Sequence, residues 1–199
     1  MPNSLNNDDQ AVLIGSVPAS RHAIFWLLAI GGCAADLATK HSVFDSLGVP
    51  GASEPWWLWE GYVGIETATN PGALFGMGAG GANWFAGLSV VAMVGILYWL
   101  FVRKAAVDGL LTFALGCVTG GILGNLYDRL GLWTATGPDG EQYKDIQEVR
   151  DWILLRYGNF TWPNFNIADC LLVCGAALLF WHAFFVADRP KTDGSDDPS

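Results

Sequence analysis

The sequence predicts an all-α polytopic membrane protein: four transmembrane helices, a small extracytoplasmic β element, and an inserted loop between the third and fourth spans. Two observations predict this class. Hydrophobic residues make up 52% of the 199 residues and charged residues only 15%, which is unusual for a soluble chain of this length. The hydrophobic residues are also gathered into long, nearly uncharged blocks instead of following the periodicity of an amphipathic fold.

Each block is long enough to cross a bilayer. A helix rises about 1.5 Å per residue and the hydrocarbon core is about 30 Å thick, so roughly 17 to 25 apolar residues form one span. We therefore expect one membrane domain over residues 21–188, with its spans at about residues 23–40, 83–102, 108–128 and 167–187. The polar ends, residues 1–20 and 189–199, are expected to be disordered. A cleaved signal peptide is the alternative for the first block, but a convincing small-residue cleavage site is missing.

The connections between the spans set the topology. A short turn, Arg103 to Asp108, joins the second and third spans, so the two long connections must share the opposite face of the membrane. Lys and Arg divide equally between the two faces, yet they crowd the short turn and are absent from residues 41–82. Because basic residues favour the cytoplasmic side, we expect the turn and both termini in the cytoplasm.

The first long connection carries signals of its own. Pro55 is followed by three tryptophans, whose amphipathic rings suit the headgroup region. Tyr62 to Thr69 then has the composition of a short strand. A small sheet on the outer membrane surface and an irregular interfacial loop both fit this pattern.

Ionisable residues gather at the same ends of three spans. Such groups are costly near bilayer depth, so those that remain normally face the interior of the bundle and are functional. They are Asp36, Lys40, Asp128, Arg129 and Asp169. We therefore expect one polar layer to which three helices contribute. Asp36 and Lys40 lie at positions i and i+4, where they can form a simple interfacial ion pair, shape a site, or do both.

Two sequence motifs supply several residues of this layer. Asn125, Asp128 and Arg129 follow directly on Gly124, one of the small residues that let helices approach closely. Such a polar run brings no benefit to a lipid-facing helix. At the start of the fourth span, Asp169 can stabilise the helix N-terminus, with Asn166 as its N-cap, or it can belong to the site.

The four cysteines lie in or beside the spans and lack the spacing of a metal site. They are Cys33, Cys117, Cys170 and Cys174. We interpret them as packing residues. Cys170 follows Asp169, but no neighbouring histidine in the sequence can activate it as a nucleophile.

Three motifs, in order among four spans, carry a resemblance to a known family. They are Asn-x-Gly-Ala-x-Phe at residues 70–75, Gly-Asn-x-x-Asp-Arg at 124–129 and Phe-Asn-x-Ala-Asp at 165–169. With Asp36-x-x-x-Lys40 in the first span, the chain resembles lipoprotein signal peptidase (signal peptidase II) over about residues 23–187.

The resemblance implies an aspartic endopeptidase of the bacterial inner membrane, with its active site toward the outer face. Its substrate would be a prolipoprotein with a diacylglyceryl-cysteine, cleaved before that cysteine. The implied catalytic pair is Asp151 and Asp169. The sequence departs from the family pattern before Asp151: Arg150 replaces an apolar residue, and residues 131–148 lengthen the link from Arg129. Asp145 is the alternative first acid.

The remaining expectations complete the site. Binding and supporting roles are assigned by position in the motifs to eight residues: Asp36, Lys40, Asn70, Gly72, Asn125, Asp128, Arg129 and Asn166. We expect no cofactor, no metal and no nucleic acid, but contact with membrane lipid, and a monomer. Two carboxyls that share a proton can act as acid and base in peptide hydrolysis without a metal. A small proton-coupled transporter or membrane scaffold is the alternative, although relay acids should then continue across the bilayer.

Overall fold

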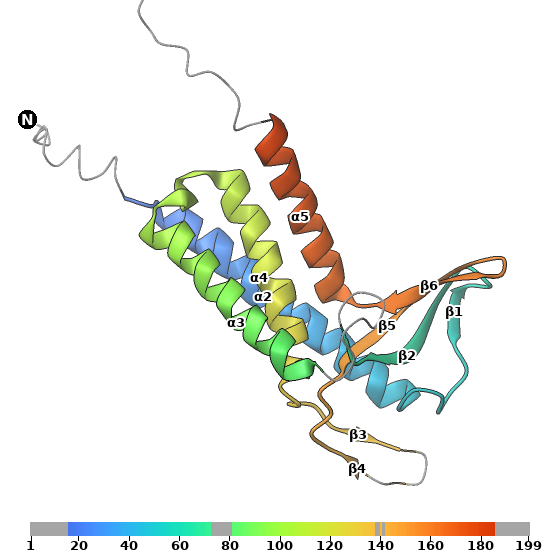
Figure 1. Ribbon diagram of the computed structural model, residues 1–199. Helices are drawn as coiled ribbons and strands as arrows, with labels where there is room; N and C mark the ends of the chain where they lie inside the picture. The colour runs from blue at the N-terminus through green and yellow to red at the C-terminus, as the bar shows by residue number, and fades with distance from the viewer. Residues whose placement is uncertain (1–15, 73–80, 138–139, 141, 186–199) are drawn as a thin grey trace, which may run out of the picture.

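A computed structural model of the chain describes residues 16–72, 81–137, 140 and 142–185, and it has four long helices with a sheet at one end of the bundle (Figure 1). The helices are α2 (Ala19–Leu47), α3 (Ala82–Leu97), α4 (Gly109–Arg129) and α5 (Ile167–Phe185). By length and composition, four helical stretches can span a membrane, one of which is α3 with its continuation to Val102. The prediction of four helices long and apolar enough to cross a membrane is confirmed. The expected disorder of residues 1–20 and 189–199 lies almost entirely outside the described residues, although α2 already begins at Ala19.

The first span is longer than predicted and the second ends irregularly. α2 continues beyond residue 40 to Leu47 and ends at Gly48, which has a φ of 79° and donates its backbone N–H to the Phe44 carbonyl at 3.0 Å. α3 passes into a π-helical turn, η2 (Tyr98–Val102), and a short 3-10 helix, η3 (Ala105–Val107), follows. The extra turns of α2 carry it out of the bilayer-length segment toward the sheet (Figure 1).

Helix α4 lies at the centre of the bundle and packs against α2, α3 and α5. Glycines make the close contacts possible. A β-carbon at Gly120 would lie 3.0 Å from the carbonyl oxygen of Leu28 on α2, and one at Gly121 would lie 2.5 Å from the carbonyl oxygen of Ala168 on α5. The backbones of three helices therefore meet where the polar residues of α4 begin.

The sheet has four antiparallel strands in the order β1-β2-β5-β6. Strands β1 (Trp56–Trp59) and β2 (Val63–Asn70) come from the first long connection, and β5 (Val149–Tyr157) and β6 (Phe160–Phe165) come from the second. The small β element is confirmed, but the all-α class was too narrow. The strand β5 is not predicted from the sequence, because charged residues interrupt its apolar run at Arg150, Asp151 and Arg156.

The inserted segment, residues 131–148, contains two short strands that pair separately from the main sheet. Its strands, β3 (Ala135–Thr136) and β4 (Gln142–Tyr143), pair antiparallel beside the main sheet (Figure 1). In the main sheet, Ala68 of β2 pairs with Asp151 of β5, and β6 leads directly into α5. This path brings Asp151, on strand β5, close to Asp169, at the start of helix α5.

Candidate active site

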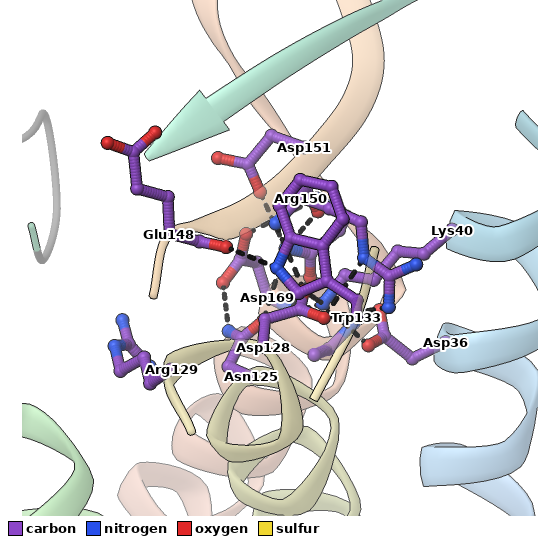
Figure 2. A network of polar contacts seen from close by, with 12 residues as sticks. Asp36, Lys40, Asn125, Asp128, Arg129, Trp133, Glu148, Arg150, Asp151 and Asp169 are labelled. Atoms are coloured by element: carbon purple, nitrogen blue, oxygen red, sulfur yellow. Dashed lines mark hydrogen bonds and ion pairs between the residues drawn. The ribbon is translucent and has the colours of Figure 1, made fainter. Parts of the chain in front are cut away.

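A polar layer lies where the sheet joins the bundle, and Figure 2 shows its members. Most come from α2, α4, β5 and the start of α5, and Trp133 and Glu148 come from the inserted segment, residues 131–148. All are residues that the sequence motifs single out, apart from Arg150, Trp133 and Glu148. The layer therefore unites segments from the whole length of the chain.

The two acids are linked through asparagines. Asp151 is buried on β5, and its Oδ1 accepts a hydrogen bond from the side-chain nitrogen of Asn166 at 2.6 Å. Asp169 lies in the first turn of α5, and its Oδ1 accepts from the side-chain nitrogen of Asn125 at 2.9 Å. Each carboxyl is thus held by an amide from a different element.

Asn166 also begins α5. Its side-chain oxygen accepts from the backbone N–H of Asp169 at 2.9 Å, and its own backbone N–H donates to Oδ2 of Asp169 at 3.2 Å. This reciprocal pair is the geometry of a capping box, which satisfies the free N–H groups of a helix start. Asp169 therefore stabilises the start of α5 and also belongs to the polar layer, so the two alternatives raised from the sequence are compatible.

Asp151 has an unusual protonation behaviour. Burial raises the pKa of Asp151 to about 7, with a further upward contribution from the charge of Asp169. The hydrogen bond from Asn166, the charge of Lys40 and a hydrogen bond from Asn70 act in the opposite direction. A carboxyl of this kind keeps its proton near neutral pH, as a general acid requires.

Lys40 ties the helices together beneath the acids. Its Nζ lies 2.7 Å from Oδ2 of Asp36 and 3.0 Å from Oδ2 of Asp128, and it donates to Oδ1 of Asn125 at 3.0 Å. Asp36 also accepts from the backbone N–H of Ala168 at 2.9 Å. Asp36, Lys40 and Asp128 are fully buried, so Lys40 does not extend to the membrane surface.

Arg129 and the Asn70 turn form the other side of the layer. Nη2 of Arg129 donates to the carbonyl oxygen of Gly72 at 3.3 Å, and its guanidinium lies over the ring of Phe85, 5.6 Å from the centroid. The backbone N–H of Gly72 donates to Oδ1 of Asn70 at 3.0 Å. The rest of that motif, residues 73–75, lies outside the described residues.

Asp145 lies apart from the acids. It is exposed in the inserted segment, its φ is 54°, and it is not among the residues that line the cavity beside Asp151 and Asp169. The geometry therefore favours Asp151 as the partner of Asp169. Among the described residues, no group of three or more His, Cys, Asp or Glu side chains is arranged to hold a metal ion.

Sequence reasoning missed Arg150 as part of the layer. Its guanidinium is paired with Asp128 at 2.7 Å, and it lies over the ring of Trp133. The only signal was an arginine directly before Asp151, which was interpreted as a departure from a family pattern.

A cavity of about 820 Å³ opens beside the acids. Four of its lining residues belong to the polar layer: Asn125, Arg129, Asp151 and Asp169. Further polar residues on it are Thr69, Asn70 and Asn164, and apolar residues of the sheet and α5 on it include Leu155, Trp162, Phe165, Leu172 and Val173. A cavity that holds both acids and many apolar side chains suits a ligand with a polar group and hydrocarbon chains.

The fold and the layer define a multi-pass membrane protein with two neighbouring acids at the end of its helical bundle. The sequence pattern of the family described as "Signal peptidase (SPase) II" matches residues 28–185. The chain belongs to this family of membrane peptidases, and it is a multi-pass bacterial membrane protein.

Individual relatives agree with this assignment. A lipoprotein signal peptidase from Rhodopirellula baltica is 52% identical over 185 residues, which cover 91% of this chain and 81% of the relative. Another from a Synechocystis species is 30% identical over 89% of this chain and 98% of the relative. A solved structure described as a bacterial membrane enzyme has a TM-score of 0.64 at 22% identity, covering 83% of this chain and 92% of that one, and so shares the fold.

Proposed function

We propose that this chain is an aspartic endopeptidase that removes signal peptides from prolipoproteins, cleaving before the diacylglyceryl-modified cysteine. Membership of the signal peptidase II family supports the substrate class. The observation that carries the aspartic mechanism is the acid pair itself: Asn166 bonds to both Asp151 and Asp169 at the end of one cavity.

In this mechanism Asp151 is the acid and Asp169 is the base. Asp169 takes a proton from a water molecule, which attacks the carbonyl carbon of the scissile peptide bond. Asp151, whose pKa is raised to about 7, gives its proton to the nitrogen of the leaving amine. The C–N bond then breaks, the new carboxyl keeps the oxygen of water, and the amine carries the proton away.

The supporting residues fix this pair in place. Asn125 and Asn166 hold the carboxyls through their amides. Arg129 lies at the cavity with Asn70 and can bind the carbonyl groups of the substrate backbone. Leu172 and Val173 of α5 form an apolar wall on which the acyl chains of the lipidated cysteine can lie.

The polar layer belongs at the outer membrane face in this proposal, with both termini and the turn at residues 103–108 in the cytoplasm. The basic turn supports that orientation. Exposed aromatic residues of the sheet support it as well, because such rings suit the headgroup region of the bilayer. A single chain supplies both acids, so we expect a monomer to be active.

The experiment is cleavage of a diacylglyceryl prolipoprotein by the purified protein in detergent. We expect the wild type to release the signal peptide, and Asp151→Asn and Asp169→Asn each to lose at least about 1,000-fold in kcat. Asp45→Asn, at an exposed carboxyl paired with His41, is the matched control and should keep full activity.

Two outcomes would overturn the assignment. If Asp145→Asn abolishes cleavage while Asp151→Asn does not, the first acid is Asp145. If the folded wild type never cleaves but moves protons across reconstituted vesicles, the transporter alternative holds instead.

A further inference from the structure

Arg150 makes an unusually complete contact with one buried carboxylate. Its Nε and Nη2 donate to Oδ1 of Asp128 at 3.0 and 2.7 Å, and its backbone N–H donates to Oδ2 of the same residue at 3.0 Å. Both oxygens of Asp128 are therefore bound by a single residue. Since Asp128 lies in the last turn of α4 and Arg150 is the second residue of β5, this contact fixes the start of the strand against the helical bundle.

Aromatic rings cover the guanidinium. Its Cζ lies 5.0 Å from the ring centroid of Trp133 and 5.9 Å from that of Phe44, within the range of a cation–π contact. The two rings meet edge to face at 5.5 Å, and Trp133 is only 4% exposed. Nε1 of Trp133 donates to the carbonyl oxygen of Glu148 at 3.1 Å, which closes the inserted segment at its base (Figure 2).

The two aromatic residues that cover the guanidinium come from segments that are longer than the sequence predicts for the family link and for the first span. Trp133 belongs to the inserted segment, residues 131–148, and Phe44 belongs to the turns of α2 beyond residue 40. Neither part is needed to cross the membrane. Both instead bury the one cation that stands next to Asp151 in the sequence.

We call the contacts of Arg150 with Asp128, Trp133 and Phe44 the Arg150 clamp. Asn166 connects this clamp to Asp151. The side-chain nitrogen of Asn166 lies 3.3 Å from the carbonyl oxygen of Arg150 and 2.6 Å from Oδ1 of Asp151. One amide group therefore donates to both the backbone carbonyl of Arg150 and the adjacent carboxylate of Asp151. A shift of the strand at Arg150 would lengthen both contacts.

We propose that Arg150 is a positioning residue for Asp151, and that the inserted segment supplies Trp133 to hold it. The inference rests on the proposed peptidase function. The charged groups that face Asp151 are Asp169, Lys40 and Arg129. Loosening the clamp changes none of these charges, but it weakens the hydrogen bond from Asn166 that stabilises the ionised form of Asp151.

The test compares matched substitutions on one strand. Arg150→Lys keeps the charge but loses the paired donors and the planar stacking group. Arg156, also on β5, lies 5.0 Å from the ring centroid of Trp57 and is not among the cavity-lining residues, so Arg156→Lys is its control. Trp133→Leu and Trp57→Leu form the second pair.

We expect Arg150→Lys and Trp133→Leu to lower kcat roughly 10- to 100-fold, because small displacements of a reacting group cost this much. KM should stay within about threefold. The alkaline limb of the pH profile should move to higher pH, whereas Arg156→Lys and Trp57→Leu should keep the wild-type kcat and profile. Trp133→Phe, which retains an aromatic ring, should recover part of the lost kcat.

A purely structural role would lower the thermal stability of Arg150→Lys and leave kcat and the pH profile of the folded fraction unchanged, and that result overturns the inference. A second readout does not need activity. The carboxyl carbon of Asp151, followed by NMR in labelled protein, should titrate at higher pH in Arg150→Lys than in Arg156→Lys. The NMR titration therefore tests the positioning role of Arg150 even if the wild type lacks peptidase activity.

Discussion

The side-chain nitrogen of Asn166 lies 2.6 Å from Oδ1 of Asp151, and the backbone nitrogen of Asn166 lies 3.2 Å from Oδ2 of Asp169. One residue therefore binds both acids, although they lie on a strand and a helix. The same residue caps α5 through its side-chain oxygen. The start of the fourth span and the spacing of the acid pair are consequently set together.

Asn166 allows its two roles to be separated. Asn166→Ala removes the donor to Asp151 and the helix cap, so we expect kcat to fall roughly 100-fold and stability to fall by about 1 kcal/mol. Asn166→Ser keeps an N-cap oxygen but lacks the amide donor, so it should recover stability without recovering kcat. Recovery of both by serine would contradict the role of the amide. Single-turnover cleavage and thermal unfolding in detergent measure the two effects.

The raised pKa of Asp151 predicts how activity responds to pH. A carboxyl that must donate a proton is lost to the reaction once it ionises. Because the pKa of Asp151 is raised to about 7 by burial and by Asp169, cleavage should decline above about pH 7. A kcat profile measured on one substrate across this range checks the expectation. A profile that stays flat to about pH 9 would contradict the assignment of Asp151 as the acid.

The same carboxyl makes a prediction for stability. Its pKa is higher in the folded state than in the unfolded chain, so the folded state binds more protons between these values and stability falls as pH rises through about 7. Asp151→Asn removes this dependence. Its melting temperature relative to wild type should therefore be higher at about pH 8 than at about pH 5. The opposite order would mean that Asp151 is stabilised as an anion.

The spans and the polar layer follow from the sequence because lipid imposes simple rules. Uncharged blocks of bilayer length predicted the four helices, and the cost of burying ions singled out Asp36, Lys40, Asp128 and Asp169. These rules act on single segments. They do not depend on knowing which segments meet.

The sheet and the Arg150 clamp follow from pairings between distant segments. β5 pairs with β2, which comes from the other long connection, and it places Val149, Asp151 and Leu155 on the cavity, a relation that the second connection alone does not reveal. Arg150 was therefore interpreted as a departure from a pattern, because its partner Asp128 and its cover Trp133 become neighbours only in the folded chain.

Gly124 leaves room for the buried carboxylate of Asp36. A β-carbon at this position would collide with that carboxylate and lie 3.2 Å from Cβ of Ala168. Gly124→Ala should displace Asp36 from Lys40 and from the start of α5, so we expect a stability loss of about 1–3 kcal/mol together with a clear loss of kcat. Gly95→Ala is the control, since nothing lies within 4 Å of a β-carbon there. Equal activity in the two variants would show that the close packing is dispensable.

The far end of the bundle offers a contact that should affect stability alone. Oδ1 of Asp108 accepts from the backbone N–H of Leu111 at 3.0 Å, which caps α4, and its Oδ2 lies 2.7 Å from Nε2 of His182 on α5. Asp108→Ala should therefore cost about 1–2 kcal/mol, and Asp108→Asn, which keeps a capping oxygen, should cost less. Neither should change kcat in the folded protein, because Asp108 and the acid pair lie at opposite ends of α4 and α5. A selective loss of kcat in Asp108→Ala at full stability would mean that the two ends of the bundle are coupled during catalysis.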